Sequence, residues 1–509
     1  MPAVRSGRRR ALLGIVVAAV LVGPLAWFWA SSLVPSTYSV MDLGYADFGG
    51  GPIDPAHLEG HAGHATEAAG EISLATMTGP KAGAPDVTVT LVARRESFRL
   101  ASGERVDGYT LNHQSPGPVI TVRQGQLLQV TLVNESVPDG VTLHWHGVDV
   151  PNAEDGVAGV TQDAVRVGHS YQYRFVVPDA GTYWYHSHQV SHEQVLKGLF
   201  GALVVLPRNG TVDAPTAAGP AIDQVALVHT YDGRRTLDGR VGPARVDAAA
   251  GSTVRVRVID SDNGPLHVTV VGAPFRLAAT DGHEVHEPQP VTGQVVALGA
   301  GGRADLLVTT PDDGSAVRVD LGGGPTYLVV GPPGSTEPPA APRGQPQLDL
   351  LRYGQPEPLP FDPQLADRRF TYDIGRRPGF LDGRPGLWWT VNGHTFPHTP
   401  MFVVTQGDVV RMTISNQSGQ AHPMHLHGHH AVVLSRDGEQ AQGSAWWVDT
   451  IDVADGETYE IAFVADNPGV WMDHCHNLPH ATQGLVTHLV YTGVGEPYRV
   501  GGPVHNAPE

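Results

Sequence analysis

A short stretch near the C-terminus, residues 474–480 (HCHNLPH), constrains the fold and chemistry of this chain more than any other. It contains Cys475, the sole cysteine in 509 residues, which therefore cannot form an intrachain disulfide. On an extended strand successive side chains point to opposite faces, so His474 and His476 are expected on one face and Cys475 on the other. A thiolate and two imidazoles on opposite faces can serve two different metal centres. The motif therefore predicts two metal centres joined by a short covalent path, an arrangement suited to electron transfer.

Three more pairs with the same His-x-His spacing lie upstream. Together with the last motif they supply eight imidazoles: His144, His146, His186, His188, His425, His427, His474 and His476. His422, Cys475 and His480 remain as a separate set of two imidazoles and one thiolate, which is the ligand set of a blue-copper site when a weak axial neighbour is present. Structural zinc sites close with four ligands, so eleven candidates argue against zinc and against histidines scattered without function.

In their order and spacing, these motifs resemble those of the multicopper oxidases, the family of laccases and cuprous oxidases. The resemblance covers roughly residues 84–495, and its motifs are highly specific. It implies four copper ions per chain: one mononuclear type 1 copper, and a cluster of one type 2 and two type 3 coppers.

The resemblance also implies a role for each candidate ligand. It assigns His422, Cys475 and His480 to the mononuclear copper, and His144 and His425 to the type 2 copper. It assigns six residues to the type 3 pair: His146, His186, His188, His427, His474 and His476. His429 and His430 then have no ligand position left, and they are expected behind the ligands or at the surface.

Two further positions follow from the resemblance. Leu485 stands where the family has methionine or a non-ligating aliphatic residue beside the mononuclear copper. Leucine has no lone pair to donate, so this centre is expected to be three-coordinate and comparatively oxidising. Asp155 lies where the family has a carboxylate implicated in handling protons, although a simple Asp-Gly turn explains the same residues equally well. Many members have an acid directly after the last ligand histidine, whereas this chain has Ala481.

The chain also contains an internal repeat that predicts an all-β fold. Residues 118–134 and 400–416 both read as strand, glycine turn and strand, and each leads into a histidine motif. A third copy ends in residues 265–270, where it keeps His267 but has Thr269 in place of a second histidine. We therefore expect the middle copy to have lost its ligand pair and to act as a spacer.

The family resemblance implies that each copy is a cupredoxin-like Greek-key β-sandwich domain. The expected boundaries are 84–211, 220–333 and 365–495, with a proline-rich linker at 334–364.

The N-terminus reads as a targeting segment. Basic residues, Arg5 and Arg8 to Arg10, precede an apolar run at 11–34, which is just long enough to span a bilayer. The sequence around Arg9 and Arg10 also resembles a twin-arginine export signal. Residues 1–34 are therefore expected to be a membrane anchor or a cleaved signal, with the body outside the cytoplasm and membrane contact through this segment alone.

Residues 35–83 are rich in Gly, Ala, Glu and His and predict a flexible lead-in. His57, His61 and His64 lie within it. They would either scavenge copper or belong to a solvated linker.

The expected activity is a laccase-like one-electron oxidation of phenols or aromatic amines, coupled to the reduction of O2 to water. Only seven methionines occur, without a methionine-rich insert, and this weighs against Cu(I) as the donor. Cuprous oxidation nevertheless stays open as the alternative.

A net charge of −18 argues against nucleic acid as a partner. A copper nitrite reductase would not need four His-x-His pairs, and a non-enzymatic copper protein would be expected to lack some of the ligands.

Overall fold

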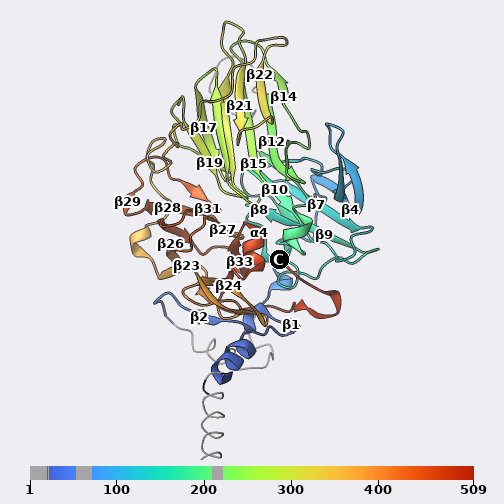
Figure 1. Ribbon diagram of the computed structural model, residues 1–509, viewed down its shortest axis with the longest axis vertical. Coiled ribbons are helices and arrows are strands. Elements are labelled where there is room, and N and C mark those ends of the chain that lie inside the picture. Colours follow the sequence, from blue (N-terminus) through green and yellow to red (C-terminus); the bar gives the residue numbers. More distant parts are fainter. Residues whose placement is uncertain (1–19, 21, 53–71, 209–221) are drawn as a thin grey trace, which may run out of the picture.

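The computed structural model describes residues 20, 22–52, 72–208 and 222–509. Three β-sandwiches make up the body, and they surround a common centre (Figure 1). The prediction of an all-β fold is confirmed in this form. In the view of Figure 1 the middle sandwich lies at the top, the first at the right and the third at the lower left.

The first sandwich packs a sheet in the order β5-β4-β7-β9 against one in the order β6-β11-β10-β8. Its strands are β4 (Val87–Arg99), β5 (Arg105–Leu111), β6 (Ile120–Arg123), β7 (Leu127–Asn134), β8 (His144–His146), β9 (Ser170–Val176), β10 (Gly181–His186) and β11 (Phe200–Leu206). Buried and partly exposed residues alternate along β7, as expected for a strand with one face on the core. The buried residues of both sheets form one apolar core.

The middle sandwich consists of a six-stranded and a five-stranded sheet. Its strands are β12 (Ile222–Tyr231), β13 (Arg234–Leu237), β14 (Ala244–Asp247), β15 (Thr253–Asp260), β16 (Leu266–Val271), β17 (Phe275–Thr280), β18 (His283–Glu284), β19 (Val295–Leu298), β20 (Arg303–Thr309), β21 (Val317–Leu321) and β22 (Tyr327–Gly331). His267 is exposed on β16, so this sandwich repeats the architecture without an inward imidazole pair at that position.

The third sandwich pairs a sheet in the order β2-β25-β34-β33-β27-β31 with one in the order β24-β23-β26-β32-β28-β29. Its strands are β23 (Arg368–Leu381), β24 (Arg384–Val391), β25 (Pro400–Val404), β26 (Val409–Asn416), β27 (His422–Leu426), β28 (Ala431–Arg436), β29 (Glu439–Gln440), β30 (Trp447–Val448), β31 (Thr450–Val453), β32 (Thr458–Val464), β33 (Val470–Cys475) and β34 (Val486–Tyr491). The short helix α4 (Leu478–Thr482) connects β33 to β34.

The described part of the lead-in is ordered, so the prediction of a flexible segment is wrong there. β1 (Thr37–Tyr38) pairs with β36 (Val500–Gly501), β2 (Tyr45–Asp47) extends a sheet of the third sandwich beside β25, and β3 (Ile72–Ser73) pairs with β35 (Val494–Gly495). Val40 and Leu74 are buried in the core of the third sandwich. Pairing with free strand edges and burial of these two apolar side chains hold the lead-in in place. Its composition did not predict these contacts. His57, His61 and His64 lie outside the described residues.

The proline-rich linker is anchored near its middle, by two leucines three positions apart. Leu348 is buried in the core of the middle sandwich, and Leu351 in the core of the third. The segment therefore crosses between the two sandwiches along a fixed path.

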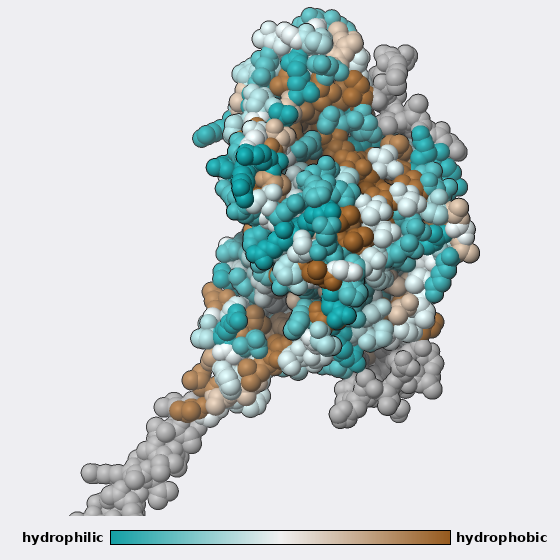
Figure 2. Space-filling model, turned by 90° about the vertical axis from the view of Figure 1, so that its right-hand side faces the viewer, coloured by the Kyte–Doolittle hydropathy of each residue, from teal (hydrophilic) through white to brown (hydrophobic). Residues whose placement is uncertain are grey.

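At the N-terminus, residues 22–31 are helical, and residues 22–30 are exposed. Their apolar side chains colour the stalk at the lower left of Figure 2 brown where it meets the body. Within the described ranges, no helix combines the length and the apolar character needed to cross a bilayer. Most of the predicted anchor falls on residues 1–19 and 21, outside those ranges, so the anchor stays a prediction.

Candidate metal centre

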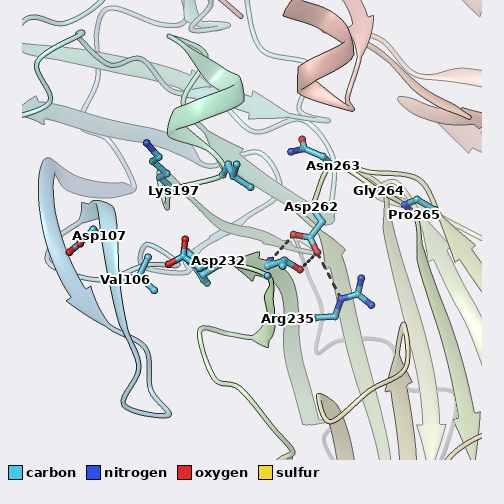
Figure 3. A pocket seen from close by; sticks show the side chains of 13 residues that line it. Val106, Asp107, Lys197, Asp232, Arg235, Asp262, Asn263, Gly264 and Pro265 are labelled. Atoms are coloured by element: carbon cyan, nitrogen blue, oxygen red, sulfur yellow. Dashed lines mark hydrogen bonds and ion pairs between the residues drawn. The ribbon is translucent and has the colours of Figure 1, made fainter. Parts of the chain in front are cut away.

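A cavity of about 550 Å³ lies between the first and middle sandwiches (Figure 3). Asp262, which lines it, accepts hydrogen bonds from the backbone and hydroxyl of Thr230 and lies 3.9 Å from Arg235. None of the predicted metal ligands lines it. The predicted ligands gather instead at the junction of the first and third sandwiches.

The predicted mononuclear set converges inside the third sandwich. His422 begins β27, Cys475 ends β33, and His480 lies on α4. The sulfur of Cys475 is 3.6 Å from His422 Nδ1 and 3.8 Å from His480 Nδ1, and these two nitrogens are 3.2 Å apart. Two adjacent strands and one helix thus aim two nitrogens and a sulfur at one point.

Neutral groups hold these two imidazoles in place. His422 Nε2 lies 2.8 Å from the Ser418 hydroxyl, and His480 Nε2 lies 3.3 Å from the Asn477 amide nitrogen. The Trp389 ring packs against both imidazoles, with centroids 4.6 Å and 4.5 Å away. The Arg376 guanidinium lies over the Trp389 ring, 4.2 Å from its centroid.

The protonation states of this set suit metal binding. Burial lowers the pKa of His422 to about 3 and of His480 to about 4, with a smaller effect from the positive charge of Arg376 on each. Both imidazoles therefore have a free lone pair at neutral pH. Burial raises the pKa of the Cys475 thiol well above its usual value. The thiol is therefore expected to lose its proton only when a cation is bound between Cys475, His422 and His480.

Leu485 is fully buried in the same core as Cys475. Its backbone amide donates to the His480 carbonyl, and its carbonyl accepts from the Cys475 amide, each at 3.1 Å. The residue expected at the axial position is thus tied through its backbone to two of the three candidate ligands.

The eight remaining histidines form a single cluster between the first and third sandwiches. One convergent group contains His146, His186 and His476, and a second contains His188, His427 and His474. His144 and His425 are left, with their Nε2 atoms 3.4 Å apart. Register explains how each sandwich contributes: His186 lies opposite His144 on paired strands β10 and β8, and His425 lies opposite His474 on β27 and β33.

A carboxylate links two of these imidazoles. Asp155 is almost fully buried, and its two oxygens accept from Nδ1 of His144 at 3.1 Å and Nδ1 of His427 at 3.0 Å. It follows the 3₁₀ turn Asn152–Glu154 and precedes Gly156, whose φ of +77° suits glycine. Asp155 is therefore a turn residue and a partner of the cluster at once.

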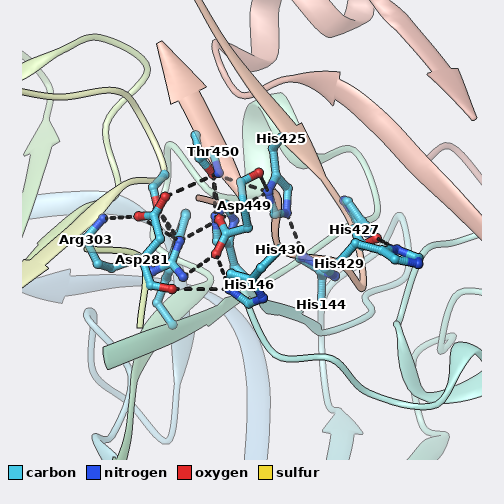
Figure 4. A network of polar contacts seen from close by, with 12 residues as sticks. His144, His146, Asp281, Arg303, His425, His427, His429, His430, Asp449 and Thr450 are labelled. Carbon is cyan, nitrogen blue, oxygen red and sulfur yellow. Dashed lines mark hydrogen bonds and ion pairs between the residues drawn. The ribbon is translucent and has the colours of Figure 1, made fainter. Parts of the chain in front are cut away.

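A second carboxylate, Asp449, was not anticipated from the sequence (Figure 4). Its Oδ1 accepts from His146 Nε2 at 3.1 Å and lies 3.4 Å from His425 Nδ1. Arg303, from β20 of the middle sandwich, holds Asp449 through two hydrogen bonds, one of 2.7 Å. Burial opposes ionisation, but Arg303 holds the pKa of Asp449 well below its usual value. The middle sandwich is thus more than the predicted spacer, since its arginine positions a partner of two cluster histidines.

The two leftover histidines lie behind the cluster and are buried. His429 donates to the His427 carbonyl and lies 2.6 Å from the Tyr491 hydroxyl. His430 lies 3.2 Å from Asp449 and 3.3 Å from Asp149. Although burial opposes it, Asp149 raises the pKa of His430 to about 10. His429 and His430 thus lie behind the predicted ligands, one of the two places expected for them, and not at the surface.

The last residues of the sequence also contact the cluster. The Pro508 carbonyl accepts from His188 Nδ1 at 3.0 Å, and a Glu509 oxygen lies 3.2 Å from His474 Nδ1. Burial raises the pKa of Glu509 to about 8. The spacing of the motifs does not indicate these contacts, because His188 and Pro508 lie 320 positions apart and Glu509 lies outside every histidine motif.

Several ring nitrogens in the cluster have no hydrogen-bond partner among the residues that the structure describes. They are His146 Nδ1, His186 Nε2 and both nitrogens of His476. Buried polar atoms are nearly always paired, so such nitrogens indicate a bound ion. Burial, followed by neighbouring imidazoles, lowers the pKa of these three histidines well below the usual value, so they are neutral. Neutral imidazoles and one thiol are the donor set that copper prefers, and the residues present fit it.

Known proteins share these features. Two family profiles described as multicopper oxidase match residues 93–210 and 366–493. The multicopper oxidase MmcO of Mycobacterium tuberculosis is 27% identical over 459 residues, covering 80% of this chain and 87% of that protein. Laccase-25 of Oryza sativa subsp. japonica is 27% identical over 518 residues, covering 74% and 87%.

Solved structures agree. The multi-copper oxidase from Pseudomonas Thermotolerans superposes with a TM-score of 0.65 at 28% identity, covering 80% of this chain and 100% of that one. Fet3p, described as a multicopper oxidase that functions in iron import, shares the fold with a TM-score of 0.68 at 20% identity, covering 80% and 90%. Together with the two convergent ligand sets, these matches show that the chain belongs to the multicopper oxidase family, the copper-dependent oxidoreductases that reduce O2.

Proposed function

We propose that the eleven residues hold four copper ions. His422, Cys475 and His480 would bind the mononuclear copper, and His144 and His425 the type 2 copper. The type 3 pair would be bound by His146, His186 and His476 on one side and by His188, His427 and His474 on the other. When bound, copper supplies the one-electron redox chemistry by which four electrons from a donor reduce O2 to two waters.

The observation that carries the proposal is the link between the two sets. Cys475 belongs to the mononuclear set, while its neighbours His474 and His476 belong to the two cluster triads. The Cys475 carbonyl also accepts from His474 Nδ1 at 3.2 Å, which adds a hydrogen-bonded path beside the covalent one. The chain thus provides a direct connection from each triad to the same sulfur.

Carboxylates beside the cluster would manage protons and orient the rings. Asp155 accepts from His144 and His427, so it fixes which nitrogen of each ring faces the cluster. We also assign to Asp155 the delivery of protons as O2 is reduced, since its oxygens touch two cluster imidazoles.

The donor would be a phenol or an aromatic amine. A cavity of about 640 Å³ lies beside α4 and is lined by residues 481–484, which directly follow His480. Tyr38, Trp388 and Phe396 give it an aromatic wall. A largely apolar cavity with a few polar groups is typical of small-molecule sites, and its position brings a bound ring close to the His480 side of the mononuclear set.

The N-terminal sequence supports a location for this activity. Basic residues followed by the apolar run at 11–34 favour export, so we place the catalytic body outside the cytoplasm, anchored or secreted. Cell fractionation with an antibody against the body checks this assignment, and a cytoplasmic signal would reject it.

Oxygen uptake with three donors tests the proposed activity: a phenol, Fe(II) and Cu(I), each with copper content measured in parallel. We expect the fastest uptake with the phenol. Trp388→Ala should raise KM for the phenol with unchanged blue absorption, whereas Leu387→Ala, an exposed neighbour outside the cavity, should not. Faster uptake with Cu(I) than with the phenol would assign the enzyme to the metal-ion oxidases instead.

A further inference from the structure

The last residues of the apolar run at 11–34 are fixed to one hairpin of the third sandwich. Strands β23 and β24 form this hairpin, and Asp382 and Gly383 make its turn. The Asp382 amide donates to the Ser32 carbonyl at 2.9 Å, and Asp382 Oδ1 accepts from the Val34 amide at 3.3 Å. The Gly383 amide donates to the Ser32 hydroxyl at 3.1 Å. The run therefore ends at a defined place on the body, at the foot of the molecule in Figure 1.

Large apolar side chains around this junction are exposed. They are Trp27, Phe28 and Leu33 of the run and Leu387 on β24. Figure 2 shows apolar side chains on the stalk where it meets the body. A Cβ at Gly383 would lie 3.2 Å from Leu33 Cδ2, so the run and the hairpin are in contact and share one apolar surface. Such a surface marks an interaction site, and tryptophan near the end of an apolar run is typical of the membrane–water interface.

Basic residues lie beside the apolar ones. Residues 376–388, the end of the hairpin, contain three arginines and a single aspartate, whereas the whole chain has a net charge of −18. Arg377 and Arg384 are exposed. Arginines are attracted to anionic lipid headgroups, and apolar side chains to the layer beneath them. The end of the hairpin therefore has the composition of a surface that rests on a bilayer.

The cavity beside α4 reaches from this junction toward the mononuclear set. Val34, the last residue of the apolar run, lines it together with Leu381 and Arg384 of the hairpin. Residues 481–484, which directly follow His480, line the same cavity. A single cavity thus connects the foot of the predicted anchor with the neighbours of a mononuclear ligand.

We propose that this cavity takes its electron donor from a bilayer, and that the donor is a hydroquinone with a long apolar tail. The inference rests on the predicted anchor and on the proposed oxidation of phenols, whose source it names. It extends the predicted membrane contact from the N-terminal segment to the β23–β24 hairpin. The ring would occupy the cavity beside residues 481–484, while the tail stays among the lipid chains beside Val34 and Leu387.

The electron balance suits this class of donor. Each hydroquinone loses two electrons and two protons, one electron at a time, and becomes a quinone. Two hydroquinones therefore supply the four electrons and four protons with which one O2 becomes two waters. The quinone is uncharged and keeps its tail, so it returns to the bilayer.

O2 uptake by the full-length, copper-loaded protein in lipid vesicles tests the inference. Two hydroquinones with the same ring are compared, one with a decyl tail and one without a tail. Leu387→Asp places a charge on the surface that contacts lipid, outside the cavity. We expect it to lower kcat/KM for the tailed donor about tenfold. The rate with the tailless donor and the blue absorption should be unchanged, because an exposed side chain contributes little to folding.

Leu365→Asp is the matched control. Leu365 is an exposed leucine of the same sandwich, and it precedes the start of β23, whereas the hairpin turn follows the end of that strand. Fourteen residues of β23 separate the two places, about 45 Å for an extended strand. This variant should oxidise both donors as the parent does.

A second measurement needs no turnover. Cys475 is fully buried, so a cysteine introduced by Leu387→Cys or Leu365→Cys can be labelled alone with a fluorescent dye. Lipid with a spin label in its chains quenches only a dye that touches the bilayer. We expect strong quenching of the dye at position 387 and none at position 365.

Three results would overturn the inference. Equal quenching at the two positions would remove the membrane contact. An unchanged kcat/KM of Leu387→Asp for the tailed donor, or an equal loss in Leu365→Asp, would show that the donor enters from water, with phenol oxidation intact. Absence of uptake with either hydroquinone, in protein with four coppers, would reject the proposed oxidation of phenols as well.

Discussion

The eight-histidine cluster and the mononuclear set lie side by side, yet their surroundings differ in kind. The outward nitrogens of the cluster rings contact three carboxyl groups, those of Asp155, Asp449 and Glu509. All three sandwiches contribute, because Arg303 of the middle one holds Asp449. The mononuclear set is held by a hydroxyl, an amide and an indole, all from the third sandwich. No carboxylate of the described residues contacts its two imidazoles.

This difference separates two tasks. Carboxylates around imidazoles stabilise positive charge and exchange protons, which the reduction of O2 to water consumes. Uncharged neighbours and the nearby positive charge of Arg376 disfavour the oxidised, more positive state of a metal bound to His422, Cys475 and His480. They therefore raise its reduction potential and make it a stronger electron acceptor. The neighbours of the cluster thus suit proton transfer, and those of the mononuclear set suit a high reduction potential.

Asp449→Asn should cause the largest loss of copper and activity, and the copper should be lost from the cluster alone. It removes one charge partner of the fully buried Arg303 and leaves Asp281, 3.3 Å away, so the loss of unfolding free energy should stay below the about 3–5 kcal/mol of a buried ion pair that is broken completely. We expect loss of cluster copper and of O2 uptake, with blue absorption retained. Copper analysis, optical spectra and thermal unfolding measure this. Asp452→Asn, three residues further on in β31, is the control, and equal losses in both variants would reject the assignment.

Asp155→Asn should slow O2 reduction about 10- to 100-fold, the usual range for partners of metal ligands. An asparagine has a single acceptor oxygen, so one of His144 and His427 loses its carboxylate contact, while the turn is kept. The blue band should be unchanged. Steady-state O2 uptake across acidic and neutral pH is the measurement. Turnover equal to that of the parent at every pH would leave Asp155 as a turn residue only.

Arg376→Gln should act on the mononuclear set. The ring spacings place the guanidinium carbon within about 9 Å of the His422 ring centre. At an effective dielectric constant of about 20, a unit charge at that distance is worth about 2 kcal/mol, and partial exposure reduces this. We expect the potential to fall by up to about 80 mV, with cluster copper unchanged. Redox titration checks it, and a constant potential would show that Arg376 only covers Trp389.

Leu485→Met should give the smallest shift. If Leu485 occupies the axial position, a thioether there stabilises the oxidised copper, and a fall of about 59 mV corresponds to a tenfold change in equilibrium. Leucine and methionine have similar volumes, so packing should hold. Titration of both proteins measures the potential, and a value equal to or above that of the parent would make Leu485 an ordinary core residue.

The candidate ligands were predictable because their spacing is local. Alternation along β33 separates Cys475 from His474, and His-x-His pairs on adjacent strands need no distant information. The supporting shell was not predictable in this way. Asp449 lies 303 residues from His146, and Arg303 comes from a sandwich without ligands. The prediction of a flexible lead-in was wrong for the same reason. Strands β1 to β3 form by pairing with distant segments, namely β25 and two strands near the C-terminus.

The account depends most on Cys475 serving one copper while its neighbours serve others. Cys475→Ser, loaded with copper, tests this directly by optical and electron paramagnetic resonance spectroscopy with O2 uptake. We predict that the intense blue absorption disappears and donor oxidation stops, while the type 2 signal of the cluster remains. A blue band near full strength in this variant would contradict the account.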